Sequence, residues 1–172
     1  MLQKANANDY SRIVEFYKYV AENTPNMAIY GRWIYGIYPT STIIKSYIDG
    51  GFMYYVEDDN KIVAAVAITP FQTKDYHGIS WSKEFNDNEV TVIHVLCVDP
   101  TLQQKGYAQK VVEEVVTNAK ENGQKSVRLD ALSCNIPAHK LYEKVGFKKC
   151  DVKKWYADNT GWIDFYLFEY NC

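Results

Sequence analysis

A run of almost uninterrupted apolar residues, from residue 89 to residue 98, places the strongest constraint on how this chain can fold. Only Thr91 and His94 break its apolar character after the first residue. The run is too short to cross a membrane as a helix, and apolar residues at successive positions suit a strand that is covered on both faces. Pro100 then stops the pattern. The sequence therefore predicts a central, fully buried strand here.

The rest of the chain alternates between helical and strand periodicity. We expect helices at about 9–22, 41–48, 108–122 and 137–145, and further strands at about 2–5, 52–57, 61–69, 126–131, 147–156 and 162–170. Residues 71–88 are polar and aromatic and are interpreted as a long loop. No repeat or linker divides the chain. We therefore expect residues 1–172 to form one domain of mixed α/β (α+β) class, with a largely antiparallel central sheet flanked by helices.

Charge and composition argue against several classes of protein. The net charge is −2 with both signs interspersed, which disfavours a nucleic-acid partner. The chain has no run of about 18 apolar residues and no apolar stretch at its start, so we expect a cytoplasmic protein without a membrane partner. Its four cysteines and three histidines are scattered, so we expect free thiols and no metal site.

The segment from Val98 to Ala108 has the features of a phosphate-binding turn. A buried strand ends, a polar loop follows, and a helix begins, so the free amides at the helix start form an anion site. Gly106 lets a ligand approach the backbone, and Lys105 and Lys110 add positive charge. The Walker motif and the three-glycine dinucleotide motif are both absent. On composition alone, a glycine that merely starts a helix is the competing interpretation.

Two motifs in this order resemble those of the GNAT superfamily of acyl-CoA-dependent N-acetyltransferases. The first is Gln103-x-x-Gly106-x-Ala108, and the second is Asn135-x-x-Ala138-x-x-Leu141-Tyr142-Glu143-Lys144-x-Gly146-Phe147. The expected helix and strand lie between them, and the order of elements agrees over nearly the whole chain. The first third matches in pattern only, without a sharp motif.

The resemblance implies a binding mode for acetyl-CoA as cosubstrate. Backbone amides would hold its pyrophosphate; they belong to Gln103, Gln104, Lys105, Gly106, Tyr107 and Ala108. The strands at 89–98 and 126–132 would splay apart, through a bulge near Leu96–Val98. Pantetheine would then lie in the gap, along the backbone of Leu96, Cys97 and Val98, with Asn135 on its other side. Members of the family often form homodimers.

Attack of an amine on a thioester needs a base and a proton donor. Tyr142 matches the family tyrosine that faces the sulfur, and a phenol stays protonated at neutral pH; alternatively its ring only packs in the core. His94 is the candidate base because it interrupts an apolar strand; alternatively it is a buried histidine with satisfied hydrogen bonds. Glu89 is the reserve base, acting through a water chain; alternatively it is an exposed charge at a strand end.

Other residues near these motifs leave more alternatives open. Cys97 and His94 would form a nucleophile pair only if a bulge brought them to one face, so we expect no such pair. His139 is expected at the surface. The aromatic residues Trp33, Tyr35 and Tyr38 either line a pocket for an amine or pack a helix on the sheet.

The sequence thus predicts an N-acetyltransferase that uses acetyl-CoA and a small-molecule or peptide amine, in a direct ternary complex. The acceptor itself is not readable from these residues. A coenzyme A-binding sensor without catalysis is the alternative, and a partner-binding domain without coenzyme A is a third possibility.

Overall fold

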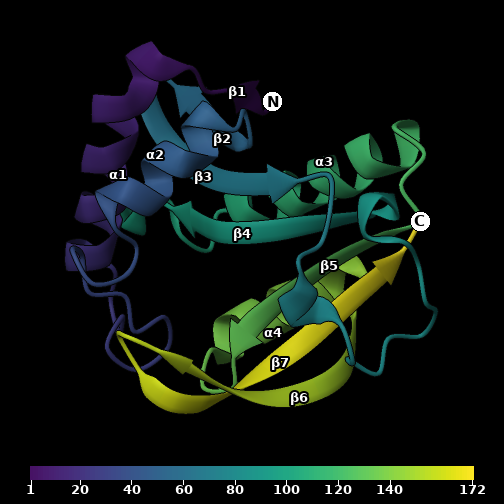
Figure 1. Cartoon of the computed structure of the whole chain (residues 1–172). Coiled ribbons are helices and arrows are strands. Elements are labelled where there is room, and N and C mark those ends of the chain that lie inside the picture. The colour runs from purple at the N-terminus through teal and green to yellow at the C-terminus, as the bar shows by residue number, and fades with distance from the viewer.

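A seven-stranded sheet in the order β1-β2-β3-β4-β5-β7-β6 runs through the computed structural model, which describes residues 1–172 (Figure 1). The strands are β1 Gln3–Lys4, β2 Met53–Asp58, β3 Lys61–Thr69, β4 Val90–Val98, β5 Ser126–Leu132, β6 Lys148–Ala157 and β7 Gly161–Asn171. The helices are α1 Tyr10–Asn23, α2 Ser41–Asp49, α3 Tyr107–Glu121 and α4 Ile136–Val145. Only β4 and β5 pair in parallel, so the predicted class and the largely antiparallel sheet are confirmed.

Helix boundaries follow from local capping and from one apolar stripe on each helix. The α1 stripe buries Ile13, Phe16, Tyr17 and Val20, spaced at one helical turn. Upstream of α1, Asn6 and Asp9 form a reciprocal capping box around the short helix 7–9. Thr40 caps α2 by accepting a hydrogen bond from the Ile43 amide at 3.1 Å. The predicted helices are therefore reproduced within a few residues.

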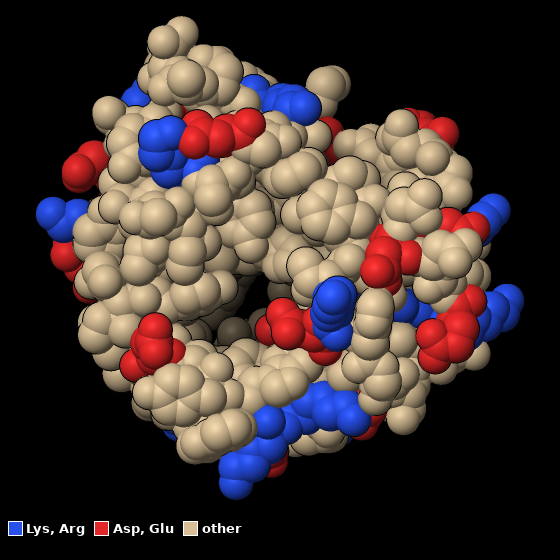
Figure 2. Space-filling model, in the orientation of Figure 1, with Lys and Arg blue, Asp and Glu red and all other residues tan.

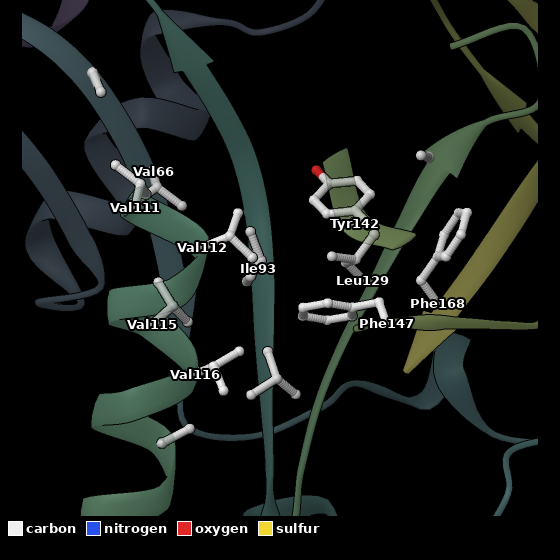
Figure 3. Packing of buried hydrophobic residues seen from close by; sticks show 14 of the residues in the cluster. Val66, Ile93, Val111, Val112, Val115, Val116, Leu129, Tyr142, Phe147 and Phe168 are labelled. Atoms are coloured by element: carbon white, nitrogen blue, oxygen red, sulfur yellow. The ribbon is translucent and has the colours of Figure 1, made fainter. Parts of the chain in front are cut away.

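Helices cover both faces of the sheet. On one face, α3 and α4 bury a cluster that includes Val112, Val115, Leu129 and Phe168 (Figure 3). On the other face, α1 and α2 cover β2 to β4, while the long loop after β3 covers β5 and β7 through Tyr76, Ile79 and Trp81. The central strand β4 is consequently buried on both sides, as its apolar run predicts. No helix is long and apolar enough to span a membrane.

The two central strands diverge soon after they meet. They pair only between Val90–Val92 and Ser126–Arg128, so β4 has no partner on its β5 side from Ile93 onward. A bulge reinforces the divergence: His94 pairs with Ala67 and Cys97 with Ala65, which leaves one extra residue on β4. The predicted bulge therefore exists, but its left-handed residue is Val95 (φ 45°), just before the expected 96–98.

The splayed ends enclose a hollow that Figure 2 shows as an opening in this face of the molecule, with acidic side chains at its rim. The segment between α1 and α2 reaches from α1, against which Trp33 packs, to the half of the sheet formed by β5, β7 and β6. Its Tyr30 carbonyl lies 3.6 Å from the Cys134 thiol, and its Arg32 carbonyl accepts a 2.7 Å hydrogen bond from Asn159 in the β6–β7 turn. This segment therefore closes the gap between β4 and β5 on one side.

Candidate active site

The loop between β4 and α3 presents free backbone amides. Asp99 stabilises its start by accepting hydrogen bonds from the amide and hydroxyl of Thr101, at 2.8 and 2.7 Å. Gln104 and Gly106 adopt left-handed φ values of 64° and 87°, and Gly106 precedes α3 at the N-cap position without a side-chain cap. Within the chain, no acceptor lies opposite the amides of Gln103, Gln104, Gly106, Tyr107, Ala108 and Gln109. These donors and the helix dipole form a site suited to an anion.

Space around this loop suits a ligand as bulky as a diphosphate. A Cβ placed on Gly106 meets nothing within 4 Å, so the backbone there faces open space. Lys105 and Lys110 are exposed close by. The Gln103 side chain lies 3.5 Å from the Thr24 hydroxyl and connects the loop to the end of α1. The residues predicted to bind pyrophosphate therefore fit that group.

Helix α4 contributes a tyrosine and an asparagine on the opposite side of the gap. The side-chain Oδ1 of Asn135 accepts a hydrogen bond from the Ala138 amide at 3.3 Å and caps the helix, which leaves the Nδ2 group free to donate. Tyr142 is buried against Phe147 and Phe168, yet its hydroxyl has no partner in the chain. Figure 3 shows this oxygen between the strands of Ile93 and Leu129. Burial, then the charge of Asp130, raises the pKa of Tyr142, so it stays protonated.

One expectation about α4 was wrong. His139 is not at the surface: it is buried, stacks on Tyr166 with ring centroids 4.9 Å apart, and its Nε2 lies 2.9 Å from the Leu132 carbonyl. It shares a helix face with Tyr142 because residues three apart are neighbours on a helix. Packing of α4 on the sheet therefore buries both.

His94 lies on the face covered by α1 and α2. Its ring stacks on Tyr47 of α2 at 5.6 Å between centroids, and its Nε2 is 3.2 Å from the Thr69 hydroxyl. Burial lowers the pKa of His94 to about 4, so the ring is neutral at physiological pH. The histidine is thus packed and hydrogen-bonded as the structural alternative requires, but its second ring nitrogen has no partner in the chain.

The bulge also places Cys97 on the same face as His94, contrary to strict alternation. The two side chains nevertheless do not interact, because the Cys97 thiol is packed beside Tyr17 in the core under α1. Burial strongly raises the pKa of this thiol and keeps it protonated. All four cysteines are free, and no three metal-binding side chains cluster.

Glu89 lies apart from the gap. Its carboxylate accepts 2.9 Å hydrogen bonds from the backbone and side chain of Asn86, in a capping box that precedes β4. Five residues separate it from His94, about 16 Å along an extended strand. The structure therefore gives Glu89 a local structural role at the paired end of β4 and does not bring it to the other candidates.

Two of the three predicted acceptor aromatics pack together. Trp33 contacts Tyr17 and Tyr38 with ring centroids 5.9 and 6.3 Å apart, whereas Tyr35 stacks on none of them. Trp33 also lines an open cavity of about 550 Å³ between α1, the following segment and the β6–β7 turn, together with Arg32 and Asn159. Trp33 thus packs on α1 and also lines this cavity, and its role in acceptor binding stays a prediction.

Sequence reasoning missed Asp130, an acidic residue inside β5. Its carboxylate accepts a 2.7 Å hydrogen bond from the Tyr76 hydroxyl, in the loop after β3. Burial raises its pKa, and the carboxylate of Asp75 raises it further. The sequence did offer one signal, because Arg128 and Asp130 are charged residues within a mostly apolar strand. In the structure Arg128 forms a buried ion pair with Glu169, whereas Asp130 forms no ion pair.

The comparisons with known proteins agree with this geometry. Residues 25–147, which include the loop before α3 and Tyr142, match the Acetyltransferase (GNAT) family. This chain belongs to that family. The GNAT acetyltransferases use acetyl-CoA, which agrees with the free amides found before α3.

Among curated proteins, the chain is 29% identical over 102 residues to the ribosomal protein bS18-alanine N-acetyltransferase of Haemophilus ducreyi. The aligned residues cover 59% of this chain and 59% of that protein. This chain is 28% identical over 111 residues to N-acetyltransferase 8 of Homo sapiens, and the aligned residues cover 63% of this chain and 44% of that protein. The matched stretch thus spans about half the length of these relatives.

Solved structures show the same fold at lower identity. A GNAT family acetyltransferase from Streptococcus agalactiae superposes with a TM-score of 0.77 at 14% identity, over 100% of this chain and 95% of that one. The ribosomal-protein-S18-alanine N-acetyltransferase of Escherichia coli gives 0.71 at 14% identity, over 99% and 92%. At this identity the similarity concerns the fold.

Proposed function

We propose that this GNAT acetyltransferase transfers the acetyl group of acetyl-CoA directly to a primary amine, without a covalent enzyme intermediate. The observation that carries the proposal is the free hydroxyl of Tyr142 in the gap between β4 and β5, which opens toward the end of β4 and the loop before the uncapped start of α3. One site can thus hold a diphosphate and present a proton donor to a thioester. The packed, protonated Cys97 is unsuited to act as a covalent carrier.

Each group that would hold acetyl-CoA has unused hydrogen-bonding capacity. The free amides of Gln103, Gln104, Gly106, Tyr107 and Ala108 suit the pyrophosphate, and the Lys105 side chain adds positive charge. The edge of β4 from Ile93 to Val98, including Leu96 and Cys97, suits the amides of pantetheine in the manner of an added strand. Asn135 Nδ2 can donate from the α4 side. Bound there, acetyl-CoA supplies an acyl carbon activated by its thioester.

The residues on either side of the gap divide the proton transfers. A basic nitrogen of His94 can take the proton that the attacking amine must lose, directly or through water. Tyr142 can give its proton to the departing sulfur and regain one from solvent afterwards. Trp33 and Tyr38 would form the wall on the acceptor side, with Tyr35 further out. Glu89 contributes to this scheme only through a long water chain.

A thiol-release assay tests the proposal. Purified protein and acetyl-CoA are incubated with a panel of primary amines, and free coenzyme A is measured; release that depends on an amine is expected. A thermal-shift titration with acetyl-CoA is run beside it, because a ligand that binds the folded state raises the melting temperature. Stabilisation without release across the panel would favour the sensor alternative. The absence of both thiol release and thermal stabilisation would overturn the proposal.

A further inference from the structure

The position of Asp130 directs its carboxylate away from the apolar core. Val127, Leu129 and Ala131 of β5 pack in the cluster under α3 and α4. Because side chains alternate along a strand, Asp130 projects from the other face, the one on which Tyr76 reaches it. The last residue of β5 paired with β4 is Arg128. Asp130 is therefore the first β5 residue on this face that lies beyond the end of the β4–β5 pairing.

This carboxylate has no positive partner. None of the ion pairs in the molecule includes Asp130. The nearest cation in sequence, Arg128, is fully buried, and its guanidinium donates hydrogen bonds to Glu169, Gln72 and the Lys83 carbonyl. Tyr76 supplies the single side-chain hydrogen bond to Asp130. A carboxylate held in such surroundings gains much from a cation that enters beside it.

Tyrosines from four segments surround the same carboxylate. Besides Tyr76, the hydroxyls of Tyr38, Tyr47 and Tyr142 lie close enough for the charge of Asp130, after burial, to raise their pKa values. Tyr47 also stacks on His94, and Tyr142 points into the gap (Figure 3). The charge of Asp130 thus acts on Tyr142, the candidate proton donor, and on Tyr47, which stacks on the candidate base, and these aromatic rings favour a cation beside it.

We propose that Asp130 is the acceptor-binding carboxylate, and that it receives the ammonium group of a primary amine that carries no carboxylate beside its nitrogen. This inference rests on the acetyl transfer proposed above and specifies its substrate class. A second carboxylate next to the amine would face Asp130, with Asp75 nearby, and like charges repel. Free α-amino acids are therefore excluded, whereas alkylamines and amines whose carboxyl group is amidated are accepted.

Binding is measured apart from turnover, by calorimetry on protein saturated with coenzyme A. The probes are 2-phenylethylamine, phenylalaninamide and phenylalanine, which differ in the substituent beside the amine. We expect the first two to bind at least about tenfold more tightly than phenylalanine, because repulsion between the phenylalanine carboxylate and Asp130 weakens binding by about this factor or more. Equal affinities for all three in the wild type would overturn the inference without any variant.

Asp130→Asn then removes the charge and keeps the shape. It is expected to weaken 2-phenylethylamine binding by about tenfold or more and to reduce the discrimination against phenylalanine, while acetyl-CoA affinity stays unchanged. Asp49→Asn is the matched control, because it removes the same charge from an exposed pair with Lys45 on α2. Unchanged amine binding in Asp130→Asn would contradict the assignment.

The two proposals can fail separately. If acetyl-CoA is turned over but Asp130→Asn leaves the KM of the amine unchanged, the inference falls and the acetyl transfer stands. If acetyl-CoA neither binds nor reacts, the acetyl transfer falls, and amine binding to the wild type still decides the role of Asp130. Should Asp130→Asn not fold, Tyr76→Phe removes the hydrogen bond that orients the carboxylate and is expected to weaken amine binding several-fold.

Discussion

The Nε2 atom of His94 lies 3.2 Å from the hydroxyl oxygen of Thr69, which itself donates a 2.8 Å hydrogen bond to the Phe71 carbonyl. A hydroxyl has one hydrogen, and Thr69 uses it on Phe71. The contact with His94 therefore requires Nε2 to carry a hydrogen and donate it. In the neutral ring, Nδ1 is then the basic nitrogen. The arrangement on β3 and β4 thus selects the tautomer that leaves Nδ1 free to accept a proton.

Replacement of His94 by Gln should lower kcat by about 100-fold near pH 6.5, because a positioned base contributes this much or more. The deficit should narrow toward pH 9, where more of the amine is already deprotonated. Steady-state rates of thiol release across this range provide the measurement. Thr69→Val, which leaves the ring and removes only its partner, should lose less activity. Identical pH profiles for wild type and His94→Gln would exclude His94 as the base.

His94 should also make stability depend on pH. Its pKa in the folded protein, about 4, lies below its ordinary value of 6.5. Its stabilising contribution is therefore complete above about pH 6.5 and is lost as the pH falls toward 4. Between about pH 7.5 and 5, the loss from this group should be about 2 kcal/mol. Urea unfolding of wild type and His94→Gln at both pH values should show the difference between them change by this amount; a constant difference would contradict the prediction.

Tyr142→Phe should lower kcat by about 10- to 100-fold while acetyl-CoA affinity and stability stay nearly constant, because its hydroxyl has no partner in the chain and serves only as a donor. Tyr55→Phe is the control: its hydroxyl contacts Asp9 at 3.4 Å, away from the gap. That variant should keep kcat and lose up to about 1 kcal/mol of stability. Full activity in Tyr142→Phe would remove the phenol from the mechanism.

Gly106→Glu should weaken acetyl-CoA binding at least about 100-fold, because it places a carboxylate where a diphosphate is expected and strains a left-handed residue. Gly123→Glu is a matched control. Gly123 has a similar φ of 73°, faces open space in the same way and follows the far end of α3. Calorimetry with acetyl-CoA should therefore separate the two variants. Equal affinity in both would contradict the phosphate assignment.

Arg128→Ala should destabilise the protein by about 3–5 kcal/mol, because it leaves Glu169 charged, buried and without its partner. The same change frees the loop after β3, since Arg128 also binds Gln72 and packs 4.2 Å from the Trp81 ring. Arg12→Ala removes a more exposed pair with Glu57 and should cost less than about 1 kcal/mol. Urea denaturation measures the free energy of unfolding of both variants. Similar decreases would contradict the prediction that the buried pair contributes more to stability than the exposed one.

Local patterns were sufficient for the elements and for the family. Periodicity placed every helix and strand within a few residues, because an amphipathic helix and a buried strand each repeat over several positions. The turn before α3 and the motif on α4 identified Gly106, Asn135 and Tyr142, since a ligand that binds backbone amides constrains consecutive residues. The composition and the motifs thus carried the fold class, and the family match agrees with them.

Contacts between distant segments could not be read in this way. Alternation predicted opposite faces for His94 and Cys97, but one extra residue at Val95 brought both to the α1–α2 side. His139 looked exposed because its burial depends on β5 and β7.

Asp130 shows most clearly what only the tertiary structure decided. In the sequence it is one more charge within a strand, and nothing local distinguishes it from Arg128. Asp130 lies near four tyrosines and no cation because the loop after β3, α2, α4 and the segment before α2 each bring a tyrosine close to it. The sequence determined which elements form, since that depends on neighbours along the chain. The fold determined which charges meet, since electrostatic interactions depend on distance in space.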